Sequence, residues 1–218
     1  MVREIVFGAN DGLVSNVALV AGVAASTGDS RVVVLGGIAG LVAGAISMSL
    51  GAYVSTKSER EFREAEEARE RWEVINMREQ ELAETRHIFR LKGITGPLLD
   101  EVVTAVSRND ESWVSLMMTE ELGFPDHPPR PTLAAALMGL SFAAAATFPV
   151  VPYMFFDGTL ALAVSLGATA MALFGVGAWR ARLSQGRVWI KAAEMVVLAG
   201  VAVGAAYVIG DLIGNVVP

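Results

Sequence analysis

Residues 32–56 read VVVLGGIAGLVAGAISMSLGAYVST and contain no charged side chain. Residues 57–91 follow as KSEREFREAEEARERWEVINMREQELAETRHIFRL, which is rich in charge and contains neither Gly nor Pro. The first stretch is longer than the ~20 apolar residues that a helix needs to cross a bilayer. The second has the composition of a helix in water. The sequence therefore predicts one helix that crosses a membrane and continues, through 58–91, into solvent.

Four further apolar stretches can span a membrane, at residues 5–28, 131–156, 158–179 and 192–210. The whole chain of 218 residues is 53% hydrophobic and 18% charged, with a mean hydropathy of +0.49. This composition argues against a soluble enzyme. The absence of cysteine excludes disulfides and thiolate metal sites. The net charge of −6 argues against nucleic acid as a partner. We predict an all-α membrane protein with five transmembrane helices.

The chain divides into three predicted segments. Residues 1–56 hold spans one and two, residues 124–218 hold spans three to five, and residues 57–123 hold most of the 23 acidic residues. The middle segment is expected to be a three-helix insert, with helices over 58–91, 98–108 and 110–122. If the N-terminus is cytoplasmic, every Lys and Arg except Arg31 lies on the cytoplasmic side. The positive-inside rule therefore predicts a cytoplasmic N-terminus and insert, with the C-terminus on the far side.

Asp11 lies inside the first span, in FGANDGLVSN at residues 7–16. A carboxylate there costs at least ~2.5 kcal/mol and typically marks an ion or proton path. A proton and a metal ion would compete for it, which is the minimum requirement for exchange transport. The alternative is a structural Asp that is hydrogen-bonded to Asn10, Ser15 or Asn16.

Met48 and Glu4 are further candidates for the transport path. The Met48 thioether is a soft metal ligand, although a Met in a membrane helix is more often a packing residue. Glu4 lies seven residues before Asp11 on the same helix face, and it can equally be a solvated anchor. The spacing of Gly36, Gly40 and Gly44 predicts close helix packing.

The helix predicted over 58–91 carries four carboxylates within a wedge of about 80°. Like charges one turn apart repel unless a cation lies between them. A solvated face held by ion pairs, such as Arg69 with Glu73, is the alternative. The four residues are Glu70, Glu73, Glu81 and Glu84.

The helix predicted over 110–122 adds Met117, Met118 and Glu121. Carboxylates combined with thioethers suit Fe²⁺, and also Mn²⁺, Co²⁺ or Zn²⁺, better than Ca²⁺ or Mg²⁺. Core packing of both methionines is the alternative. The sequence Glu84-Thr-Arg-His87 resembles half of a di-iron motif, so a membrane-anchored iron-binding or ferroxidase accessory protein without transport is a rival function.

Three stretches resemble the vacuolar iron transporter family: FGANDGLVSN at 7–16, GIAGLVAGAISMS at 37–49 and YVSTKSE at 53–59. The resemblance implies a homodimeric antiporter rather than an enzyme. It would exchange Fe²⁺, with Mn²⁺ as a second ion, for protons and move iron out of the cytosol, with no prosthetic group. The membrane of residence, a plasma membrane or a vacuole-like one, is left open.

The resemblance also implies roles for particular residues. The metal ligands of the insert would be Glu70, Glu73, Glu81, Glu84, Met117, Met118 and Glu121, and the membrane path would use Asp11 and Met48. Many members of the family carry a Glu where this chain has Ala52, so one carboxylate of the path is missing.

Overall fold

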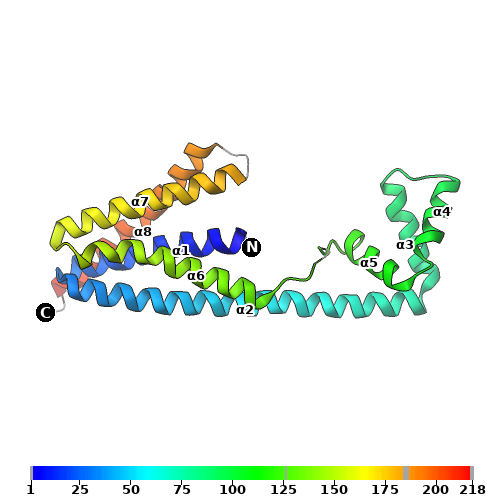
Figure 1. Ribbon diagram of the computed structural model, residues 1–218, viewed down its shortest axis with the longest axis horizontal. Coiled ribbons are helices and arrows are strands. Elements are labelled where there is room, and N and C mark those ends of the chain that lie inside the picture. Colours follow the sequence, from blue (N-terminus) through cyan, green and yellow to red (C-terminus); the bar gives the residue numbers. More distant parts are fainter. Residues whose placement is uncertain (1, 126, 184–186, 217–218) are drawn as a thin grey trace. The chain divides into compact units, whose positions relative to one another are not determined.

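The computed structural model describes residues 2–125, 127–183 and 187–216, and every regular element in these ranges is helical (Figure 1). The predicted all-α fold is thereby confirmed. Within the described ranges, five helical segments are long and apolar enough to cross a membrane, namely α1, α2, α6 together with η1, α7 and α8. The elements are α1 (Val2–Thr27), α2 (Ser30–Asn76), α3 (Arg78–Leu91), α4 (Pro97–Val106), α5 (Asp110–Glu120), α6 (Pro131–Val150), the 3₁₀ turn η1 (Val151–Met154), α7 (Gly158–Leu183) and α8 (Val188–Val216).

The chain forms two compact units. The bundle unit comprises residues 1–54 and 131–218, and the insert unit comprises residues 55–130. Helix α2 contributes its apolar part to the bundle unit and its charged part to the insert unit. The predicted insert, 57–123, falls within the second unit.

Helix α1 is the centre of the bundle unit, because it packs against α6, α7 and α8. One core cluster joins Leu13 of α1 to Leu173 of α7 and Met195 of α8. A second joins Val20 of α1 to Val33 of α2 and Val150 of α6. Since α1 also carries Asp11, this packing determines the surroundings of that carboxylate.

Glycines allow close approach between the helices of the bundle unit. A Cβ atom at Gly12 would overlap the backbone oxygen of Phe142, so α1 and α6 meet almost backbone to backbone. The predicted close packing is confirmed at Gly44, where a Cβ would overlap the ring of Phe142, and at Gly40, where it would press on Asn16. Gly36 makes only ordinary contacts.

The continuous helix predicted over 58–91 is wrong. The chain breaks at Met77, whose φ of −122° and ψ of 34° are not helical, and α3 begins at Arg78. The insert unit therefore contains four helical segments, namely the end of α2 with α3, α4 and α5. The break places Val74 and Leu82 against Trp113 and Met117 of α5. Burial of these apolar side chains overrides the local preference for an unbroken helix.

Substitution of Gly12 by Ala should destabilise the bundle unit. The added methyl must displace the backbone of α6, and overpacking of this kind typically costs about 1–3 kcal/mol. Thermal unfolding of the purified full chain measures the effect. Gly200→Ala is the matched control, because no atom lies within 4 Å of a Cβ at that helical position. Equal melting temperatures for the two variants would contradict the packing argument.

Candidate metal sites

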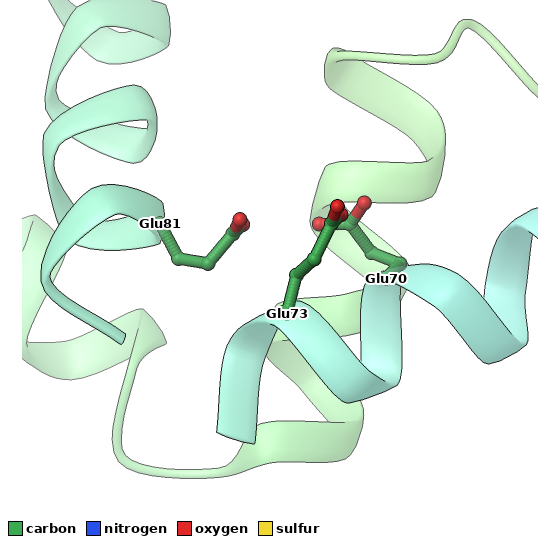
Figure 2. A group of neighbouring side chains, drawn as sticks. All are labelled: Glu70, Glu73 and Glu81. Atoms are coloured by element: carbon green, nitrogen blue, oxygen red, sulfur yellow. The ribbon is translucent and has the colours of Figure 1, made fainter. Parts of the chain in front are cut away.

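Five carboxylates of the insert unit form two overlapping groups that share Glu81. Glu70, Glu73 and Glu81 make the first group, and Glu81, Glu84 and Glu121 make the second. Within each group the ligand oxygens lie within 4.8 Å of one another. Figure 2 shows Glu70 and Glu73 on α2 pointing toward Glu81 on α3. Each group has the donor type and the spacing to surround one divalent cation.

The first group lies in a buried environment. Glu70 is 1% exposed and Glu81 is 4% exposed. Oxygen Oε1 of Glu70 and oxygen Oε2 of Glu81 have no hydrogen-bond partner among the described residues. Two ionised carboxylates whose oxygens lie within 4.8 Å would repel by at least about 3 kcal/mol at an effective dielectric constant of ~20. The geometry therefore requires a proton or a cation between these side chains.

The pKa shifts follow from this arrangement. Burial, followed by the charge of Glu81, raises the pKa of Glu70 to about 8. Burial likewise raises the pKa of Glu81. It also raises the pKa of Glu121, with a further contribution from Glu84. In the absence of a cation, the group thus retains a proton near neutral pH.

A hydrogen-bonded brace holds Glu81 in place. The indole Nε1 of Trp113 donates to Thr85 Oγ1 at 2.8 Å, and that hydroxyl donates to the carbonyl of Glu81 at 2.7 Å. The guanidinium of Arg78 lies 4.9 Å from the centre of the Trp113 ring and pairs with Asp110 at 3.0 Å. The brace therefore fixes the first turns of α3 against α5.

Sequence reasoning missed Thr85 and Trp113 as supporting residues, and it offered Arg78 as an ion-pair partner of Glu81, whereas Arg78 pairs with Asp110. Their contacts join positions that are far apart in the chain, so no local motif reveals them.

The two methionines lie in the core of the insert unit. Met117 is fully buried and Met118 is 2% exposed, and both pack with Trp113. Sulfur Sδ of Met117 lies 3.5 Å from Thr85 Oγ1. Because Thr85 bonds to the Glu81 carbonyl, this sulfur lies beside the turn of α3 that carries the shared carboxylate. Met117 thus belongs to the apolar core, as the packing alternative expects, and its sulfur also lies near the carboxylate groups.

An ion pair with arginine competes with metal binding at one carboxylate of the first group, Glu73. Arg69 lies 3.7 Å from Glu73, as the solvated-face alternative expects, but it lies closer, at 2.9 Å, to Glu66. Glu70 and Glu81 have no such ion pair among the described residues. His87 is exposed and belongs to neither carboxylate group.

A second candidate site is a cavity of about 250 Å³ in the bundle unit. The structure brings Asp11 of α1 and Met48 of α2 together in its lining. Ser15, Asn16, Ser47 and Phe142 also line it, together with Leu19, Gly40 and Gly44. Ser47 and Phe142 were not candidates from the sequence, because only the packing of α2 and α6 beside α1 makes them neighbours of Asp11.

The Asp11 carboxylate has no hydrogen-bond or ion-pair partner among the described residues. The hydroxyl of Ser15 donates to the Asp11 backbone carbonyl at 2.5 Å. The amide Nδ2 of Asn16 donates to the carbonyl of Ala146 on α6 at 2.6 Å, which ties α1 to α6. Neither residue therefore donates to the Asp11 carboxylate, and no hydrogen bond from Asn10 to it occurs in the described part of the chain.

Glu4 and Ala52 lie outside this cavity. Glu4 forms an ion pair with Arg3 at 3.4 Å and is not a lining residue. Ala52 is half-buried on α2 and is likewise absent from the lining.

Comparison with known proteins identifies the family of the chain. The model of the VIT family matches residues 2–211. Vacuolar iron transporter 1 from Oryza sativa subsp. japonica is 34% identical over 95% of this chain and 83% of its own length. Vacuolar iron transporter 1 from Arabidopsis thaliana is 32% identical over 98% of this chain and 86% of its own. Protein CCC1 from Saccharomyces cerevisiae is 31% identical over 98% of this chain and 69% of its own length. The chain therefore belongs to the VIT family of vacuolar iron transporters.

Proposed function

We propose that this integral membrane protein transports divalent iron, and Mn²⁺ as a second ion, in exchange for protons. The observation that carries the proposal is the cavity in which the unpartnered carboxylate of Asp11 meets Met48. A carboxylate and a thioether suit a first-row divalent ion. The names of the relatives point to iron, and family membership favours a transporter over an enzyme.

Exchange follows from the charge of the Asp11 site. A carboxylate in an apolar environment is stabilised either by a proton or by a cation. Metal binding at Asp11 would release its proton, and protonation would release the metal. A site that faced alternate sides of the membrane would then move the two ions in opposite directions.

We assign metal capture to the insert unit. Two groups of closely spaced carboxylates support this role, and in the first group the buried Glu70 and Glu81 have no cationic partner among the described residues. Met117 would add a thioether that favours Fe²⁺ or Zn²⁺ over Ca²⁺. Met118 is proposed as a further ligand on the resemblance alone.

Orientation and assembly complete the proposal. The distribution of Lys and Arg favours a cytoplasmic N-terminus and insert, so transport would carry iron out of the cytosol. A homodimer is proposed on the family resemblance.

Asp11→Asn should abolish both metal uptake and the accompanying proton movement, because the amide cannot alternate between a proton and a metal ion. We would measure Mn²⁺ and Fe²⁺ entry into proteoliposomes that contain a pH-sensitive dye. Asp29→Asn is the control, since an amide oxygen can still accept the 2.8 Å hydrogen bond from the Arg31 amide. Metal flux without proton movement in the wild type would refute exchange. Oxygen consumption coupled to iron binding, with no flux, would favour the ferroxidase alternative.

Glu81→Gln should weaken metal binding to the insert unit at least about tenfold, because both carboxylate groups share Glu81. Titration calorimetry of the full chain in detergent with Mn²⁺ or Co²⁺ would measure this. Glu79→Gln, an exposed position on the same helix outside both groups, is the matched control. Unchanged affinity in Glu81→Gln would place metal capture elsewhere.

The metal-free protein should lose stability as the pH rises from about 4.5 to about 8. Burial and the charge of Glu81 raise the pKa of Glu70 in the folded state to about 8, above its ordinary value of 4.5, so the folded state binds more protons in this window. Its contribution is favourable below pH 4.5 and is lost as the pH rises through 8. Thermal unfolding with and without Mn²⁺ tests this, because the ion should restore stability at pH 8. Glu70→Gln should flatten the metal-free pH profile, and a profile that rises with pH in the wild type would contradict the assignment.

A further inference from the structure

A cavity of the bundle unit, at the end where α1 begins, is separate from the Asp11 site. It is a groove of about 560 Å³ between α1, α7 and α8. Its walls are mainly apolar and include Val6, Val14, Met195 and Leu198. Arg3 and Arg180 also line it. Apolar walls combined with cationic side chains match an amphipathic, anionic ligand.

We infer that this groove binds one anionic phospholipid, whose acyl chain lies along α1 and α8 and whose phosphate meets Arg3 and Arg180. The inference goes beyond the proposed transport function and does not depend on it. Helices α1, α7 and α8 are all long and apolar enough to lie in a membrane, so hydrocarbon chains are the surrounding medium. Leu198 is 62% exposed, which leaves its wall open to that medium.

The charge around the groove favours an anionic headgroup. The side chain of Arg3 is 85% exposed, so it can reach a phosphate while it pairs with Glu4 at 3.4 Å. Arg180 and Arg182 lie in the last turn of α7, and Lys191 follows in the first turn of α8. Glu194 is the acidic residue of the lining. Four basic side chains therefore lie at this end of the bundle unit against two acidic ones, Glu4 and Glu194. The net charge of these six side chains is positive. Basic pockets between membrane helices bind anionic lipid headgroups in the same way.

The position of the groove connects it to α1. Asn10 lines the groove, and its neighbour Asp11 lines the other cavity. A lipid in the groove would thus press on one face of the helix that carries the candidate ion ligand on another. Lipid occupancy is therefore expected to affect the packing of α1 against α8.

The test measures lipid retention and thermal stability of the full chain in detergent, with phosphatidylglycerol or phosphatidylcholine added. We expect retention of one phosphatidylglycerol per chain and a higher melting temperature than with phosphatidylcholine. Arg3→Gln combined with Arg180→Gln should weaken phosphatidylglycerol retention about tenfold, since each basic side chain near an anionic headgroup contributes measurably. Arg31→Gln, in the segment that begins α2, is the charge control.

A steric pair of variants tests the apolar part of the groove. Leu198→Trp should fill it and prevent retention of either lipid. Val201→Trp, at a position on α8 that is 68% exposed and is not a lining residue, should leave retention unchanged.

Four outcomes would overturn the inference. The first is equal retention of the two lipids by the wild type, and the second is an equal loss in Arg31→Gln. The third is stabilisation by glycerol phosphate alone, which would indicate an anion site without a lipid chain. The fourth is a change from a larger to a smaller oligomer in Leu198→Trp without loss of bound lipid, which would show that a second copy of the chain fills the groove.

Discussion

A carboxylate that leaves water must be compensated by a proton or a cation, and both candidate sites depend on this constraint. In the insert unit, Glu70 and Glu81 are buried within one group of oxygens and lack other hydrogen-bond partners among the described residues. In the bundle unit, Asp11 faces a cavity without an ion-pair partner in the described ranges. The surrounding helices hold these charges close to apolar surroundings, so each site is stable only when it is occupied by a proton or a metal ion.

Much of the fold could be predicted from hydropathy alone. The stretch over 32–56 has no charge, and such a segment satisfies its own backbone hydrogen bonds in a membrane only as a helix. The break at Met77 could not be predicted, because neither Gly nor Pro marks it. It depends on the burial of Val74 and Leu82 against α5, and the sequence of α2 and α3 contains no local signal for that contact.

The break also changes how the carboxylates of the insert unit come together. In a continuous helix, Glu70 and Glu81 would lie about 16 Å apart along the axis, too far for one ion, even though they share a face. The prediction that these carboxylates share one face of a single helix therefore selected the residues of the two groups, but a single helix would not have brought them together. The residues approach because the chain turns at Met77, and the brace from Trp113 through Thr85 then fixes Glu81. The contribution of Ser47 and Phe142 to the Asp11 cavity could likewise not be predicted from the sequence, since it requires the packing of α2 and α6 beside α1.

The different charges of the two sites suit the different tasks that we propose for them. The insert unit offers up to five carboxylates, which favours capture of a scarce divalent ion. The membrane cavity offers one carboxylate, one thioether and neutral oxygens, so a divalent ion there keeps a net positive charge. A transport site must bind its ion strongly enough to admit it and weakly enough to release it. The raised pKa of Glu70 limits the affinity of the capture site in a comparable way, because near neutral pH the ion must displace a proton before it binds. In the function that we propose, the same competition between proton and metal would allow release in the membrane and would prevent irreversible capture in the insert unit.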